Sequence, residues 1–226
     1  MSTSYQKAYG QADPAVVQYA YEVFKPEDET LQQVRQAAEA KKLPPIQVGA
    51  FDALHLEVLA RMANAKKAVE IGTLCGYSGV ALSRALGSGG KLHTFEIDPI
   101  HAEVAEQAFQ NADLDAEVVV HVGPAIENLR NIENEGPFDL IFIDADKVSY
   151  PKYLAWASKN LRVGGVVIAD NTFAWGDIHH LQGLDPERAQ AVQALREFNS
   201  TVVENAQFRA TILPTSEGLT VAVKTS

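Results

Sequence analysis

A short apolar strand that runs into a glycine-punctuated turn constrains the fold of this chain more than any other feature. Residues 69–79 read VEIGTLCGYSG, and residues 80–86 then have the pattern of a helix. A strand, a glycine turn and a helix in this order open the nucleotide-type site of a doubly wound α/β fold. The sequence therefore predicts a mostly parallel sheet covered by helices, with a ligand site where this strand ends.

The same turn excludes the commonest nucleotide ligands. Its glycines are not spaced G-x-G-x-x-G, no P-loop lysine follows, and Glu70 closes the strand where it would repel a pyrophosphate. The turn suits a cofactor that brings no phosphate and carries positive charge. S-adenosylmethionine, with its sulfonium and ammonium groups, fits this description.

The rest of the chain alternates between strand and helix patterns from residue 67 onward. We expect strands at 68–71, 91–97, 117–121, 138–143 and 166–169, with a closing hairpin at 208–214 and 218–224. Alternating elements imply βαβ crossovers and a parallel sheet, to which the hairpin adds antiparallel strands. Gly164-Gly165 is interpreted as a helix-to-strand turn. We expect one domain over 1–226, in which helices within 1–62 cap an α/β core over 63–226.

Length and charge limit the classes of partner. A chain of 226 residues suits one α/β domain, and its formal net charge of -10 argues against nucleic-acid and anionic-membrane binding. The single cysteine, Cys75, excludes an internal disulfide and is interpreted as a packing residue. The start lacks the apolar run of a secretory signal, and no segment is apolar over a bilayer-spanning length. We therefore expect a cytoplasmic protein that does not bind membranes.

The predicted strands end in acidic and amide residues, and ligands of open α/β sheets bind at these carboxyl ends. Glu96 ends the second strand, where an acid commonly binds the ribose diol of a cofactor; the alternative is a solvated carboxylate. Asp144, Asp170 and Asn171 end the fourth and fifth strands. Their oxygens suit a hard divalent cation such as Mg²⁺, although the aspartates could instead cap the following helices. Two facing carboxylates need a cation or a shared proton, which favours the metal.

Two further features lie near these strand ends. Lys147 follows Asp144 by three residues and could act as a base, although taken alone a salt bridge to Asp144 or Asp146 is the better interpretation. Trp175 lies in the loop after Asn171, where an aromatic wall suits a flat substrate ring. The alternative for this loop is a surface segment packed by its own aromatics.

Together these motifs resemble the cation-dependent class I O-methyltransferases, which include catechol O-methyltransferase and the caffeoyl-coenzyme A O-methyltransferases. The resemblance covers most of the chain. Its most specific parts are Asp144-Ala145-Asp146-Lys147 and Asp170-Asn171, in this order after the glycine-turn strand. It implies a Rossmann-like methyltransferase fold: a mostly parallel seven-stranded sheet with a C-terminal antiparallel hairpin and N-terminal capping helices.

The resemblance also implies a role for each matching position. The implied cofactor-binding residues are Val48, Glu70, Gly72, Tyr77 and Ser78 at the methionine part, Glu96 at the ribose, Ala125 at the adenine and Asp144 near the sulfonium. The implied metal ligands are Asp144, Asp170 and Asn171, the implied catalytic residues are Lys147 as general base and Asp144, and the implied substrate contacts are Lys147, Asn171 and Trp175.

The implied activity is methylation of a small catechol by S-adenosylmethionine with Mg²⁺, or with Mn²⁺ or Ca²⁺, in a homodimer. Residues 50–54, AFDAL, depart from the Glu-Gly-Gln that relatives often have, which leaves the substrate open. A caffeoyl-coenzyme A-like thioester would need a basic patch, and the only lysine pairs are at 41–42 and 66–67. A hydroxylated tRNA base is a less favoured acceptor, because the negative net charge of the chain disfavours binding to RNA. A non-catalytic protein that only binds S-adenosylmethionine would not need the complete set of Asp144, Lys147, Asp170 and Asn171. The missing G-x-G-x-x-G spacing argues against a dinucleotide-dependent oxidoreductase.

Overall fold

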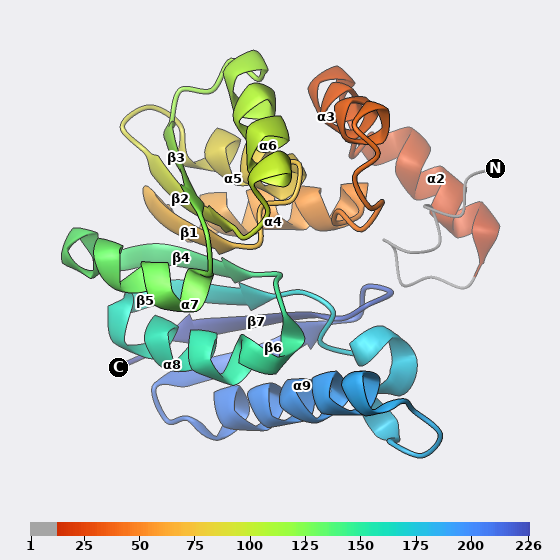
Figure 1. The fold of residues 1–226 in the computed structure, drawn as a ribbon, viewed down its shortest axis with the longest axis vertical. Coiled ribbons are helices and arrows are strands. Elements are labelled where there is room, and N and C mark those ends of the chain that lie inside the picture. The colour runs from red at the N-terminus through yellow and green to blue at the C-terminus, as the bar shows by residue number, and fades with distance from the viewer. Residues whose placement is uncertain (1–12) are drawn as a thin grey trace.

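A seven-stranded sheet organises the computed structural model, which describes residues 13–226 (Figure 1). Its strands are β1 Lys67–Ile71, β2 Lys91–Glu96, β3 Glu117–Val122, β4 Phe138–Ile143, β5 Leu161–Ala169, β6 Phe208–Leu213 and β7 Leu219–Lys224. The spatial order is β3-β2-β1-β4-β5-β7-β6, and only the pairs made by β7 are antiparallel. The strand order reverses between β1 and β4, which is where such sheets bind ligands. The predicted doubly wound sheet with its antiparallel hairpin is confirmed.

Helices cover both faces of the sheet and bury most residues of its central strands β1, β2 and β4. They are α2 Pro14–Phe24, α3 Glu29–Ala40, α4 Ala50–Met62, α5 Tyr77–Leu86, α6 Pro99–Asn111, α7 Ala125–Asn128, α8 Tyr150–Asn160 and α9 Pro186–Glu204, with 3-10 turns η1 Leu129–Glu135, η2 Lys147–Ser149 and η3 Ala174–His179. The core on one face includes residues of α3 to α6, and the core on the other includes residues of α8 and α9. Successive strand residues point to opposite faces, so Ala68 packs in the first core and Val69 in the second.

Asp-Pro pairs begin three of the helices. Asp13, Asp98 and Asp185 each accept a hydrogen bond from a backbone N–H in the first turn, and a proline follows each one. The cap satisfies an N–H that the helix leaves unpaired, and proline already has the helical φ angle.

The interpretation of Gly164-Gly165 as a turn is wrong, because β5 begins at Leu161 and runs through both glycines. The pairing register between β4 and β5 shifts between Phe138 and Leu140. Gly164 has a φ of +79°, a conformation that glycine adopts without strain. The two glycines therefore lie inside β5 and not before it. They belong to an irregular stretch of the kind that extra residues produce in a sheet.

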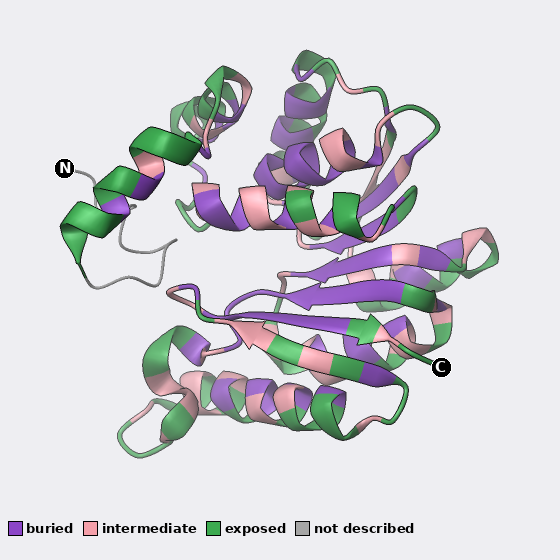
Figure 2. Cartoon of the chain, turned by 180° about the vertical axis from the view of Figure 1, so that it is seen from behind, coloured by how far each residue is buried: buried purple, intermediate pink, exposed green. Residues whose placement is uncertain are grey.

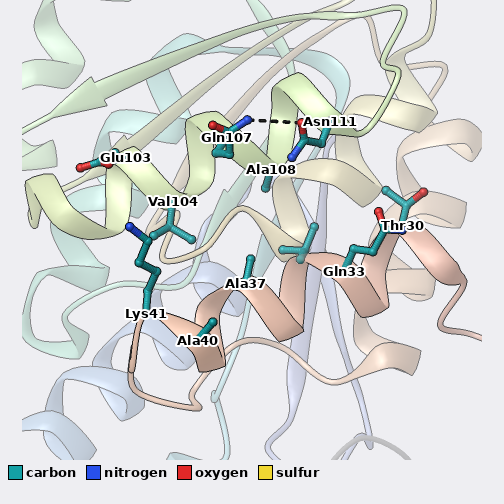
Figure 3. A pocket seen from close by; sticks show the side chains of 11 residues that line it. Thr30, Gln33, Ala37, Ala40, Lys41, Glu103, Val104, Gln107, Ala108 and Asn111 are labelled. Carbon is teal, nitrogen blue, oxygen red and sulfur yellow. Dashed lines mark hydrogen bonds between the residues drawn. The ribbon is translucent and has the colours of Figure 1, made fainter.

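The N-terminal helices lie against one side of the core, as expected for a cap. α3 contacts both α5 and α6, and a groove of about 320 Å³ between α3 and α6 is lined by Ala37, Val104 and Ala108 (Figure 3). This groove contains none of the predicted site residues. Residues 1–12 of the expected cap lie outside the described part. Within residues 13–226, no helix combines the length and the apolar character needed to cross a membrane.

Candidate active site

The ends of β1, β4 and β5 meet at one edge of the sheet and bring the predicted residues together. The carbonyl of Ile71 accepts a hydrogen bond from the N–H of Asp144 at 2.8 Å, and the carbonyl of Ile143 accepts one from the N–H of Asp170 at 3.0 Å. Gly72 has a φ of +100°, and a Cβ on it would lie 1.9 Å from the carbonyl oxygen of Asp144. Only glycine therefore lets the first turn pass this close to the end of β4.

The glycine turn is tied to β1 and β2 by buried carboxyl groups. Glu70 is fully buried and accepts hydrogen bonds from the hydroxyls of Ser78 and Thr94, both at 2.6 Å. Burial raises the pKa of Glu70 to about 7. The resemblance implied that Ser78 contacts the methionine part of the cofactor, and that role stays a prediction. Thr94 was missed because it lies on the neighbouring strand and has no motif of its own.

Glu96 lies at the end of β2, where its carboxylate accepts hydrogen bonds from the glycine turn and from the turn that precedes α6. One oxygen accepts from the N–H of Leu74 at 2.7 Å, and the other accepts from the N–H of Asp98 at 2.9 Å. Glu96 thus fixes the glycine turn relative to the start of α6. Val48 is buried just before α4, and Ala125 begins α7. The assigned cofactor roles of these residues remain predictions.

Tyr77 connects the turn to the N-terminal helices. Its hydroxyl donates to Glu27 at 2.9 Å, and Glu27 also accepts from Arg35 at 3.0 Å. The resemblance implied that Tyr77 contacts the cofactor, which stays a prediction; in the structure its hydroxyl donates to Glu27, in the segment that precedes α3. The Tyr77 side chain therefore connects the N-terminal helices to the glycine turn through a hydrogen bond.

Lys147 and Asp144 form an ion pair at the centre of the site. The Lys147 ammonium lies 2.8 Å from Oδ1 of Asp144 and donates to the hydroxyl of Tyr150 at 2.7 Å. That hydroxyl lies 3.2 Å from the carbonyl oxygen of Ile143 and 3.1 Å from that of Asp170. The salt bridge considered from the sequence is present, and the lysine is held at the strand ends. Tyr150 was missed, because only folding brings α8 beneath this site.

The predicted metal ligands adjoin this pair. Asp170 is buried, and its Oδ1 accepts from the N–H of Asn171 at 2.7 Å. The Asn171 amide donates to Glu217 and, at 3.4 Å, to Asp170. Burial and the negative charges of Asp144 and Asp52 hold the pKa of Asp170 well above its usual range.

The chemistry of this set suits a hard cation, since carboxylate and amide oxygens are its preferred ligands. A cation here would also offset the repulsion between the two aspartates. Within residues 13–226, no group of three or more histidine, cysteine, aspartate or glutamate side chains is arranged to hold a metal. The set of two aspartates and one asparagine therefore stays a prediction.

Trp175 lies beside this centre in an unusual backbone conformation. Its φ is +55°, and the Lys147 ammonium lies 6.0 Å from the centre of its ring. The guanidinium of Arg188 stacks over the indole at 3.9 Å and donates to Asp177 at 2.9 Å and to the carbonyl of Ala174 at 3.2 Å. Sequence analysis missed Arg188, which comes from the first turn of α9.

Asp52 is a further residue that sequence analysis missed, although it lies within the departing stretch 50–54. It is on the first turn of α4 and only 5% exposed. Burial raises the pKa of Asp52; His55 opposes this rise, whereas the charges of Glu217 and Asp144 add to it. The carboxyl of Asp52 is therefore influenced by the charge of Asp144 at the end of β4.

The fold and the site define a Rossmann-like methyltransferase. A sequence profile described as O-methyltransferase matches residues 21–225, so the chain belongs to the O-methyltransferase family. A catechol O-methyltransferase of Niastella koreensis is 37% identical over 201 residues, which cover 88% of this chain and 89% of that protein. The resemblance and the enzyme class, an O-methyltransferase, are thereby confirmed.

Solved structures agree with this assignment. An O-methyltransferase from Bacillus cereus in complex with SAH has a TM-score of 0.85 and 37% identity, covering 93% of this chain and 97% of that one. The O-methyltransferase TomG from Streptomyces achromogenes, involved in tomaymycin synthesis and in complex with SAM, has a TM-score of 0.85 and 31% identity, with 100% of each chain covered.

Proposed function

We propose that this O-methyltransferase transfers the methyl group of S-adenosylmethionine to one hydroxyl of a small catechol, with a divalent cation held by Asp144, Asp170 and Asn171. The observation that carries the proposal is the convergence of these residues and Lys147 beside the phosphate-excluding glycine turn. The SAM and SAH complexes of the two structural relatives support the cofactor, and the Niastella relative supports the acceptor class.

Asp144, Asp170 and Asn171 would hold the cation, whose Lewis-acid chemistry would lower the pKa of a catechol hydroxyl. Nζ of Lys147, in its neutral form, accepts the hydroxyl proton, and the ammonium that results is held by Asp144 and the Tyr150 hydroxyl. Trp175 limits the movement of the aromatic ring. The acceptor oxygen then attacks the methyl carbon in line with the departing sulfur, and positioning supplies much of the acceleration.

The proposal is tested by methyl transfer from radiolabelled S-adenosylmethionine to caffeic acid or another simple catechol, with Mg²⁺ and then with EDTA. We expect labelled product with Mg²⁺ and its loss with EDTA. Transfer that is unchanged by EDTA would contradict the metal mechanism. Cofactor binding by calorimetry with no transfer to any catechol would contradict the proposed acceptor class.

Asp144→Ala should abolish turnover and metal dependence together. It removes both a proposed metal ligand and the partner of Lys147, so we expect a loss of about 10³-fold or more in kcat/KM. The exposed Asp115→Ala is the matched control and should retain activity. An Asp144→Ala enzyme that stays active, with and without chelator, would refute the assigned centre.

A further inference from the structure

The Tyr150 hydroxyl connects the proposed base to the ends of two strands. Tyr150 is fully buried at the start of α8, and its oxygen lies 3.2 Å from the carbonyl oxygen of Ile143 and 3.1 Å from that of Asp170. Carbonyl oxygens only accept hydrogen bonds, so the single O–H group of Tyr150 donates to them. The lone pairs of the hydroxyl oxygen therefore remain to accept from Nζ of Lys147, at 2.7 Å.

Nζ of Lys147 has two hydrogen-bond partners among the described residues, Oδ1 of Asp144 at 2.8 Å and the Tyr150 hydroxyl. An ammonium has three donors, so the neutral amine that accepts a proton in the proposed function has two N–H groups and one lone pair. The two N–H groups point to Asp144 and Tyr150, and the lone pair must therefore point in the remaining direction. With Asp144 alone, the amine could rotate about its bond to Cε and turn the lone pair away.

Packing and strand pairing hold the Tyr150 hydroxyl in place. The buried ring meets Phe198 of α9 edge to face, with the ring centres 5.6 Å apart. The carbonyl of Ile143, which the hydroxyl contacts, also accepts from the N–H of Asp170 at 3.0 Å. The hydroxyl is thus fixed relative to the strand ends that carry Asp144 and Asp170, and it fixes Nζ relative to the same strand ends.

We propose that Tyr150 is a positioning residue, whose hydroxyl directs the lone pair of Nζ of Lys147 toward the acceptor hydroxyl. This inference rests on the proposed function and adds a residue to its proton transfer. In that step the O–H bond of the acceptor breaks, its electron pair stays on the oxygen, and the proton forms the third N–H bond of Nζ. Tyr150 keeps its own proton and acts only through Lys147.

The test compares Tyr150→Phe with the wild type on two acceptors, catechol and 4-nitrocatechol, at a mildly alkaline pH. The nitro group withdraws electrons from the ring, so much of the second acceptor is already ionised and needs no base. For catechol we expect kcat to fall at least about tenfold, while the KM values of catechol and S-adenosylmethionine stay within about threefold. For 4-nitrocatechol we expect kcat to fall by less than about threefold.

Tyr153→Phe is the matched control. Tyr153 is also a buried tyrosine of α8, but its hydroxyl donates to Asp146 at 2.8 Å. The control removes the same atom from the same helix without touching a partner of Lys147. It should keep kcat for both acceptors within about threefold of the wild type.

Equal losses of kcat on the two acceptors would show that Tyr150 has a structural role only, and would overturn the inference. An unchanged kcat for catechol, or a change confined to KM, would overturn it as well. A wild-type enzyme that methylates neither acceptor would instead overturn the proposed function, and the inference with it.

If Tyr150→Phe does not fold, a crystal structure of the wild type with S-adenosylhomocysteine and catechol decides the outcome. We expect Nζ of Lys147 to lie within hydrogen-bond distance of a catechol oxygen while it keeps its contacts to Asp144 and Tyr150. A Lys147 side chain that reaches the catechol only by leaving Tyr150 would overturn the inference.

Discussion

Glu70 illustrates at the residue scale how burial shapes this site. Its pKa is raised from 4.5 to about 7 because the side chain is fully buried between Ser78 and Thr94. Between these pH values the folded state binds more protons than the unfolded state does. The contribution of protonated Glu70 to stability is therefore fully present below about pH 4.5 and is lost as the pH rises to 7.

Glu70→Gln should consequently gain stability relative to the wild type as the pH rises. The amide stays neutral, so we expect the difference in free energy of unfolding to shift by up to about 3 kcal/mol between pH 5 and pH 8. Urea denaturation at the two pH values measures it. The exposed Glu103→Gln should show no such shift, and an equal difference at both pH values for Glu70→Gln would contradict the raised pKa.

Residues that end strands could be predicted, whereas residues that reach the site by packing could not. Asp144, Asp170 and Asn171 follow apolar runs, and parallel strands must end at the same edge. Tyr150 and Arg188 come from helices whose placement depends on tertiary contacts. No local pattern in the sequence marks which face of those helices meets the site.

At the scale of elements, the turn after β1 depends on the absence of a side chain at Gly72. Gly72→Ala should lower the free energy of unfolding by about 3 kcal/mol or more, because its Cβ would overlap the Asp144 carbonyl. Gly89→Ala is the matched control: Gly89 also has a positive φ, but a Cβ there meets no described atom within 4 Å. Gly89→Ala should lower the free energy of unfolding by only about 1 kcal/mol. Equal losses in thermal unfolding would contradict the steric account.

The η3 turn depends on a second element, since α9 provides the guanidinium that holds Trp175. Arg188→Lys removes the planar stack and the fork to Asp177, so Trp175 should lose its fixed position. We expect the acceptor KM to rise about tenfold while kcat stays within about threefold. Steady-state kinetics measures both, and Arg209→Lys, at an exposed position on β6, is the control. A fall in kcat with unchanged KM would contradict a role in holding the ring.

The order of the strands and helices could be predicted because their periodicity and breakers are clear. The boundary of β5 could not, since Gly164-Gly165 has the composition of a turn and the β4 pairing that extends the strand is non-local. The sequence also gives no sign that α9 runs to Glu204 or that 3-10 turns follow α7.

At the scale of the whole molecule, α2 presents an apolar face to solvent. Val16, Tyr19 and Val23 are exposed at helical spacing, while Val17 and Ala20 are buried. Figure 2 shows much of α2 as exposed. We propose that this face pairs two copies of the chain, because such a patch favours burial against a partner. Sedimentation velocity at micromolar concentration should show a dimer.

Tyr19→Glu combined with Val23→Glu should shift that dimer to monomer. Val203→Glu, at an exposed valine on α9, is the matched control and should leave the dimer intact. Monomer alone in the wild-type protein would refute the interface.

We propose that Asp144, Asp170 and Asn171 hold a catalytic cation beside the methyl donor. The most direct measurement is a crystal structure with Mn²⁺, S-adenosylhomocysteine and a catechol, read from the anomalous scattering of the metal. We expect one strong peak at this edge of the sheet, with oxygen atoms of the three side chains about 2.0–2.6 Å away. A peak elsewhere, or none at these residues in protein whose activity requires the metal, would contradict it.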